Sequence, residues 1–165
     1  MTADAPIELV SRSEEQTVQI GRALARSVEP CSIITLEGEL GSGKTRLTWG
    51  IAEGLGIDRR AVSSPTFAIV HEYPGSDGVR LIHADAYRVD ESESDDLETL
   101  LGIGADDGWV AVIEWPSRIE AMLPLDRVRV TMRHDASGGR SIRVKASSQV
   151  IDRLRTLMEQ ESIDG

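Results

Sequence analysis

Residues 31–48 read CSIITLEGELGSGKTRLT, in which an apolar run without charge is followed at once by a loop with three glycines and a lysine. The run predicts a buried strand over residues 33–37, and the residues after the loop predict a helix over 46–55 that ends near Gly54 or Gly56. Glycine permits positive φ angles and lets the backbone approach a bulky ligand closely. The loop is therefore suited to hold a group such as phosphate.

The loop has the spacing Gly38-x-x-x-x-Gly43-Lys44-Thr45, which is the P-loop pattern. In a P-loop, consecutive backbone N–H groups surround phosphates at a helix N-terminus, where unpaired donors and the helix dipole favour anions. Lys44 would neutralise the β and γ phosphates, and the Thr45 hydroxyl would ligate Mg²⁺. Only two of the 18 Lys and Arg residues are lysines, so Lys44 does not come from a lysine-rich background. The pattern predicts nucleotide binding.

Composition limits the remaining possibilities. The 165 residues suffice for one domain spanning 1–165 and are too few for two ordinary ones. A formal charge of -10 argues against tight binding of a nucleic-acid backbone by the chain alone, because such binding depends on clustered Lys and Arg, and favours a basic protein or a multi-subunit complex as partner. A single cysteine excludes a disulfide framework. With no leader pattern and no apolar run of membrane-spanning length, we expect a cytoplasmic protein without a membrane partner, monomeric when isolated.

The rest of the chain alternates helical and strand patterns. Ser13 followed by Glu14, Glu15 and Gln16 is a capping box, which predicts a first helix over 13–28. Strands are expected over 67–73, 80–88, 108–115, 126–134 and 140–147, a loop with a short helix over 90–102, and a terminal helix over 150–159. The first two strands should pair across a PGSDG turn, and the last two across ASGG, as antiparallel hairpins.

Two acidic residues stand where a P-loop needs them. Asp85 ends LIHAD, and Glu114 ends VAVIE, each after a run of mostly apolar residues. A carboxylate at the end of a neighbouring strand can hold Mg²⁺ and the attacking water against the γ-phosphate. Thr66 in the SSPTF turn can place a hydroxyl near the same phosphate, and Trp115 follows Glu114 directly. His83 is expected to be a hydrogen-bonded strand residue, since no second His or Cys lies at metal-ligand spacing.

Four motifs together indicate a family. GELGSGKT (38–45), SPTF (64–67), HADAYR (83–88) and IEWP (113–116), in this order and at these distances, resemble the bacterial TsaE (YjeE) ATPases of tRNA threonylcarbamoyladenosine biosynthesis. The P-loop alone is generic, whereas the combination is specific. The resemblance implies an α/β, P-loop NTPase-like three-layer fold with a mixed, partly antiparallel central sheet. It also implies ATP binding and hydrolysis with Mg²⁺ that support TsaB and TsaD as they modify the adenosine beside the tRNA anticodon.

The resemblance further implies the roles of individual residues. Lys44, Asp85 and Glu114 would serve catalysis, and Thr45 and Glu114 would hold Mg²⁺. The nucleotide, as ATP or ADP, would be bound by Gly38, Glu39, Leu40, Gly41, Ser42, Gly43, Lys44, Thr45, Thr66, Asp85 and Trp115, with Glu14, Gly139 and Arg140 flanking the base or ribose. Two departures limit the transfer. Arg46 replaces a threonine that often contacts the α-phosphate, and Ser117-Arg118 stand where many relatives carry an acid.

Three other functions are compatible with a P-loop. A small-molecule kinase usually has a mobile lid with clustered arginines, and no segment here shows that composition. A GTPase of the common type selects guanine with Asn-Lys-x-Asp, and this chain has no asparagine. A nucleotide-gated binding module without significant turnover would share every site residue with an ATPase, so that alternative stays open.

Overall fold

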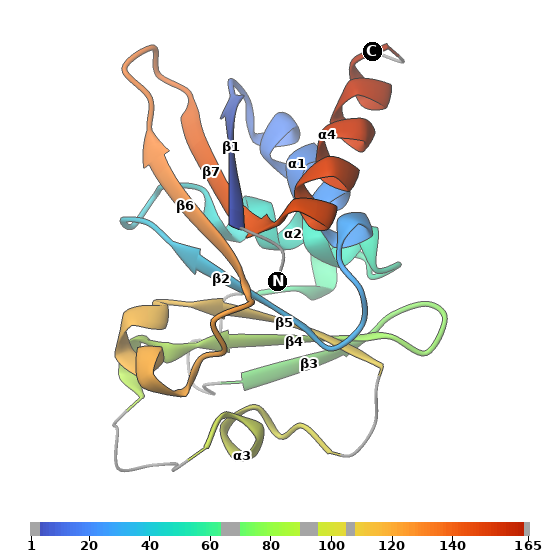
Figure 1. Ribbon diagram of the computed structural model, residues 1–165, viewed down its shortest axis with the longest axis vertical. Coiled ribbons are helices and arrows are strands. Elements are labelled where there is room, and N and C mark those ends of the chain that lie inside the picture. Colours follow the sequence, from blue (N-terminus) through green and yellow to red (C-terminus); the bar gives the residue numbers. More distant parts are fainter. Residues whose placement is uncertain (1–3, 64–69, 90–95, 105–107, 164–165) are drawn as a thin grey trace.

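The computed structural model describes residues 4–63, 70–89, 96–104 and 108–163 (Figure 1). A seven-stranded sheet in the order β1-β7-β6-β2-β5-β4-β3 runs through its centre. The strands are β1 (Asp4–Ser11), β2 (Ser32–Glu37), β3 (Val70–Pro74), β4 (Arg80–Asp85), β5 (Trp109–Glu114), β6 (Val128–His134) and β7 (Arg140–Ser147). The pairs β6/β2, β2/β5 and β5/β4 are parallel and the other three are antiparallel. The mixed, partly antiparallel sheet is thus confirmed.

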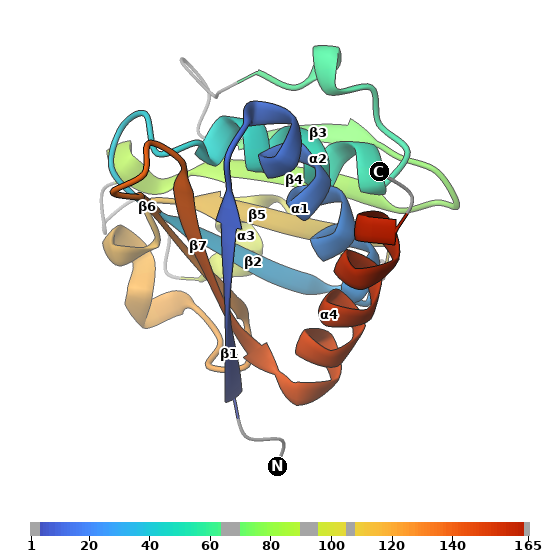
Figure 2. The same cartoon turned by 90° about the horizontal axis from the view of Figure 1, so that it is seen from above.

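Helices lie on both faces of the sheet, which gives the three layers expected. On one face α1 (Glu14–Ser27), α2 (Lys44–Gly54) and α4 (Ser148–Ile163) lie together, as Figure 2 shows from above. On the other face α3 (Leu97–Leu101) and the 3₁₀ helices η2 (Ala86–Arg88) and η3 (Pro116–Met122) lie over β5, β4 and β3. A third 3₁₀ helix, η1 (Arg59–Ala61), follows α2. None of the described helices is both long and apolar enough to cross a membrane.

The strand sequences explain where the layers stop. All six residues of β5 are buried, as are the four central residues of β4, because helices cover both faces there. In β6 the buried Val128, Val130 and Met132 alternate with Arg129, Thr131 and Arg133, so this strand faces the core on one side only. The sheet therefore has both faces covered at β5 and only one face covered at β6 and β7.

Helices α1 and α2 pack with their backbones in contact. A Cβ placed on Gly50 would lie 2.0 Å from the carbonyl oxygen of Val18, and one on Gly21 would lie 2.3 Å from that of Leu47. Only glycine allows so close an approach. The contact fixes the N-terminus of α1 beside the N-terminus of α2, where the P-loop ends.

The predicted elements are largely confirmed, with three corrections. Both hairpins form, and Ser13 caps α1 by accepting a hydrogen bond from the Gln16 N–H. The strand expected over 80–88 stops at Asp85, because its carboxylate accepts from the Tyr87 N–H and starts η2. No strand was expected over residues 4–11, yet β1 pairs with β7 along its whole length. α4 is longer than the helix expected over 150–159, and residues 67–69 of another expected strand lie outside the described part.

Candidate nucleotide-binding site

The strand register brings the two acidic residues together at the carboxyl ends of neighbouring strands. Asp85 on β4 pairs with Glu114 on β5, and Glu114 pairs in turn with Leu36 on β2. These are the carboxyl ends of parallel strands, and the chain leaves β2 at the same end to form the P-loop. Ligands of open α/β sheets bind outside these ends. Both carboxylates therefore stand beside the glycine-rich loop.

The P-loop wraps around its own lysine. Gly41 and Gly43 have φ angles of 80° and 104°, in the left-handed region that glycine adopts readily, and α2 begins at Lys44. The buried Lys44 ammonium donates to the carbonyl oxygens of Gly38 and Glu39, the latter at 3.0 Å. Burial lowers the pKa of Lys44, whereas the charge of Glu114 opposes that shift. The Lys44 ammonium is thus held at the loop, where phosphate oxygens could replace the two carbonyl oxygens as its hydrogen-bond acceptors.

Glu114 and Asp85 are positioned by different contacts. The Glu114 carboxylate is buried, and its Oε2 lies 3.2 Å from His83 Nε2, which confirms His83 as a hydrogen-bonded strand residue. The Asp85 carboxylate accepts from the Tyr87 N–H at 2.9 Å. One side chain is thus fixed inside the sheet and the other at the start of a helical turn.

Trp115 contacts the P-loop lysine and the segment after Asp85. Its backbone is left-handed, with a φ of 57°, a conformation that is uncommon for a bulky residue and that clusters at functional sites. The Lys44 Nζ lies 4.8 Å from the centre of the indole ring, within the range of a cation–π interaction. The Tyr87 ring lies 5.2 Å from the indole, centre to centre.

An ion pair and a hydrogen bond link the start of α2 and the P-loop to distant segments. Arg46, at one of the departures from the family pattern, has its Nε 3.2 Å from a carboxylate oxygen of Glu14 and stacks over the Trp49 ring at 4.2 Å. Arg140 donates from Nη2 to the carbonyl oxygen of Gly41 at 3.2 Å. Glu14 of α1 is thereby connected to α2, and Arg140 at the start of β7 is connected to the P-loop.

These segments surround one cavity of about 720 Å³. Among the residues expected at the nucleotide, it is lined by Glu14, Leu40, Gly41, Gly43, Lys44, Thr45, Asp85, Glu114, Trp115, Gly139 and Arg140. Gly38, Glu39 and Ser42 do not line it; Ser42 is buried, whereas Glu39 is exposed. Thr66 lies outside the described residues.

The cavity also has walls that the sequence did not indicate. They are Ser11, Arg12, Ser13, Thr17, Arg88 and Gly138. Ser11 and Arg12 come from the end of β1, which was not expected, whereas Ser13 and Thr17 flank the expected Glu14 at the start of α1. Arg88 belongs to the HADAYR motif, and it reaches the cavity because the chain turns at Asp85 instead of continuing as a strand.

The donor set suits a nucleotide with Mg²⁺. An α-helix of 11 residues begins at the cavity with a lysine at its first position, which is the arrangement that binds phosphates. Thr45 offers a hydroxyl, and Asp85 and Glu114 offer carboxylates. These are the oxygen ligands that Mg²⁺ combines with substrate phosphates and water. Among the described residues no cluster of three or more His, Cys, Asp or Glu side chains could hold a metal ion by itself.

Comparisons with known proteins agree with this geometry. The family model described as threonylcarbamoyl adenosine biosynthesis protein TsaE matches residues 11–142. The TsaE protein of Bacillus subtilis is 41% identical over 152 residues, which cover 90% of this chain and 89% of that protein. The Streptomyces coelicolor protein of the same name is 43% identical over 117 residues, or 68% of this chain and 75% of that protein. The crystal structure of Bacillus subtilis YdiB superposes with a TM-score of 0.68 at 30% identity and covers 99% of both chains.

Proposed function

Because this chain belongs to the TsaE family of tRNA threonylcarbamoyladenosine biosynthesis, we propose that it binds ATP with Mg²⁺ in the P-loop cavity and hydrolyses it to support that modification. The observation that carries the proposal is the meeting of three charged groups at the N-terminus of α2. Lys44, Asp85 and Glu114 all face one cavity, from a helix and two strand ends.

In this proposal the P-loop binds and orients the triphosphate. The backbone N–H groups over residues 40–45 and the helix dipole attract the phosphates, and Lys44 pairs with the β and γ oxygens. Thr45 and Glu114 would hold a Mg²⁺ ion, which would supply positive charge against the phosphates. Glu114 is suited to this role because its contact with His83 leaves one carboxylate oxygen available.

Asp85 would act on the nucleophile. Its carboxylate lies at the sheet edge one strand away from Glu114, where it can accept a hydrogen bond from the attacking water. Orientation of the water and stabilisation of negative charge account for most of the catalysis in phosphoryl transfer. Lys44 would supply positive charge for that stabilisation.

The partner in the proposal is the TsaB–TsaD complex, which the family resemblance implies. The formal charge of -10 makes tight binding to bare tRNA by this chain alone unfavourable. Hydrolysis would then be used in an assembly, and it would be slow in the isolated protein.

A turnover assay tests the proposal. The purified chain is incubated with ATP and Mg²⁺, alone and with TsaB and TsaD, and phosphate release is measured. We expect slow release alone and faster release with the partners. Binding of ATP without release in either condition would favour the nucleotide-gated module, and phosphate transfer to a small molecule would favour the kinase.

A further inference from the structure

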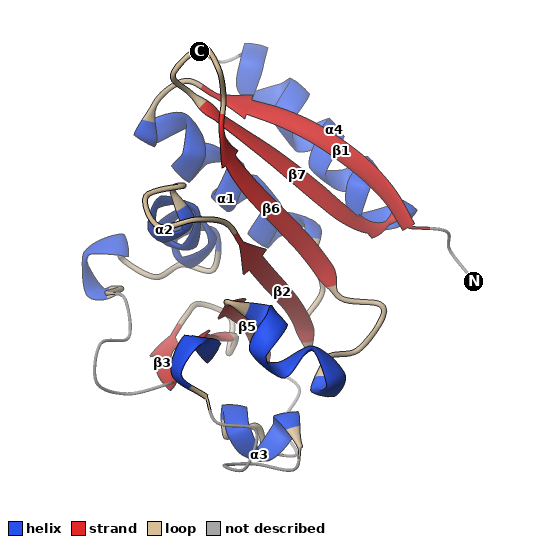
Figure 3. Cartoon of the chain, turned by 90° about the vertical axis from the view of Figure 1, so that its left-hand side faces the viewer, coloured by secondary structure: helices blue, strands red, loops and turns tan. Residues whose placement is uncertain are grey.

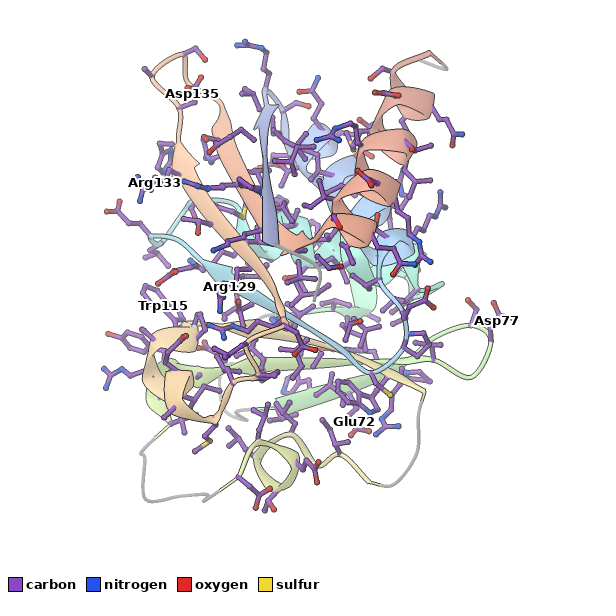
Figure 4. All side chains as sticks on the ribbon, in the orientation of Figure 1. Glu72, Asp77, Trp115, Arg129, Arg133 and Asp135 are labelled. Atoms are coloured by element: carbon purple, nitrogen blue, oxygen red, sulfur yellow. The ribbon has the colours of Figure 1, made fainter. Side chains whose placement is uncertain are left out.

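Half of the central sheet has a face that no described helix covers. Figure 3 looks onto this face, with β1, β7, β6 and β2 in front and α1, α2 and α4 behind them. We call it the open sheet face and define it by the outward residues of two strands, Arg129, Thr131 and Arg133 of β6 and Ser141, Arg143 and Lys145 of β7. Figure 4 labels Arg129 and Arg133, which leave β6 on the same side.

The charge of the open sheet face is opposite to that of the whole chain. A hollow of about 310 Å³ lies where this face meets η3. Five of the 18 Lys and Arg residues line it, against three of the 28 Asp and Glu residues, in a chain with a formal charge of -10; the buried Arg127 is paired with Glu120 and Arg143 with Glu8, which leaves a small excess of cations. Carboxylates elsewhere on the surface act weakly here, because salt screens exposed charges beyond roughly 8 Å. An anion approaching this face therefore meets a local excess of positive charge.

The strand register concentrates these cations. Arg129 lies directly opposite Lys145 in the β6/β7 pair. The pairing brings two cations to neighbouring positions on one face of the sheet. Arg143 has its Nε 3.6 Å from Glu8, and both side chains are more than half exposed, so this ion pair is weak and can be exchanged for a phosphate.

The chemistry of the face favours nucleic acid over protein. Protein interfaces depend on a buried apolar centre with aromatic anchors, and none of the described residues lining the hollow is aromatic. Contacts to phosphate oxygens instead use Arg and Lys together with hydroxyl donors, which Thr131 and Ser141 supply. Without aromatic side chains the face cannot stack unpaired bases, so it would read a backbone and not a sequence.

We propose that the open sheet face binds the phosphodiester backbone of structured RNA. The proposal rests in part on the proposed function, because a protein of tRNA modification works where folded RNA is present. The contact is weak in the isolated chain and adds to the affinity of a larger assembly. It lies apart from the nucleotide cavity, so the two sites can be tested separately.

The test measures RNA binding by fluorescence anisotropy over a range of salt concentrations. The probes are an unmodified tRNA transcript and an RNA duplex of about 16 base pairs with an unrelated sequence. The double variant Arg133→Gln/Lys145→Gln removes two cations from the face. The control Arg60→Gln/Arg155→Gln removes two exposed arginine charges on η1 and α4 and changes the net charge equally.

For the wild type we expect the logarithm of affinity to fall with the logarithm of salt concentration with a slope of about -2 to -4, for either RNA. The face variant should make that slope shallower by between about one and two, and it should weaken binding roughly 10-fold at low salt. The control variant should leave the slope unchanged.

Three results would overturn the proposal. They are no RNA binding at low salt, equal losses in the face and control variants, and tight binding of polyglutamate in place of RNA, which would indicate an acidic protein. Calorimetry with ATP on the same variants shows that they are folded, because the face residues lie outside the nucleotide cavity. Failure of the wild type to bind ATP would contradict the proposed function and leave the RNA result standing.

Discussion

Lys44 is the residue on which the phosphate site depends most. Its ammonium is buried at the loop, so Lys44→Ala removes a charge that no neighbouring side chain replaces there. We expect the fold to persist and ATP affinity to fall beyond detection, at least about 100-fold, since a charged hydrogen bond contributes up to roughly 3 kcal/mol. Titration calorimetry on the folded variant measures this. Lys145→Ala, at the other lysine of the chain, is the control. Unchanged affinity in Lys44→Ala would remove the P-loop interpretation.

A substitution at Glu114 can distinguish a role in metal binding from a structural role. Glu114→Gln keeps the size of the side chain and a hydrogen-bonding group for His83, but it removes the negative charge that Mg²⁺ prefers. We expect ATP affinity measured with Mg²⁺ to fall roughly 10-fold or more, and affinity measured in EDTA to change much less. Equal losses in both conditions would indicate that Glu114 has only a structural role at the carboxyl end of β5.

Asp85 can be tested without disturbing its turn. Asparagine caps a helical turn about as well as aspartate, so Asp85→Asn should retain the contact with the Tyr87 N–H. We expect ATP to bind with near wild-type affinity while turnover falls at least about 100-fold, because the group that orients the water loses its basic oxygen. Phosphate release at the wild-type rate would rule out this assignment.

At the level of elements, the contact between α1 and α2 has an effect of predictable sign. On helix propensity alone, Gly50→Ala should stabilise α2 by about 1 kcal/mol. The added Cβ would instead lie 2.0 Å from a backbone oxygen, so the helices must separate. We expect a net loss of roughly 2 kcal/mol in the free energy of unfolding, measured by denaturant titration. A more stable variant would show that α1 does not pack as closely as described.

The elements that the sequence predicted well are those with local signals. The capping box at Ser13 and the P-loop glycines act within a few residues, so α1 and α2 were expected to within two residues of their observed bounds. β1 gives no such signal, because it is an edge strand with Pro6, a residue that edges tolerate, and its pairing partner β7 is more than a hundred residues away. Ser11 and Arg12, which line the cavity from the end of β1, were missed for the same reason. The meeting of Asp85 and Glu114 could be expected, since both end parallel strands.

At the scale of the whole molecule, the nucleotide can be linked to an exposed surface through a short chain of contacts. Lys44 faces the indole of Trp115, which contacts Tyr87, and Tyr87 is 53% exposed. Leu40, at the tip of the P-loop, is 92% exposed. A change at the γ-phosphate would therefore be felt first by Lys44 and Trp115, and such local changes commonly order or release a segment. The residues beyond Asp85 and the SSPTF turn carry the same expectation, although part of each lies outside the described residues.

We therefore expect ATP to strengthen binding to a TsaB–TsaD complex relative to ADP or no nucleotide, as measured by pull-downs in the three conditions. Leu40→Ala should weaken the ATP-dependent binding about 10-fold, because a leucine buried at an interface contributes roughly 1.5 kcal/mol or more. Leu125→Ala is the matched control, since Leu125 is 82% exposed and does not line the cavity. Affinity that ignores the nucleotide would contradict gating. Equal effects of the two leucine variants would show that the partner does not contact the P-loop tip.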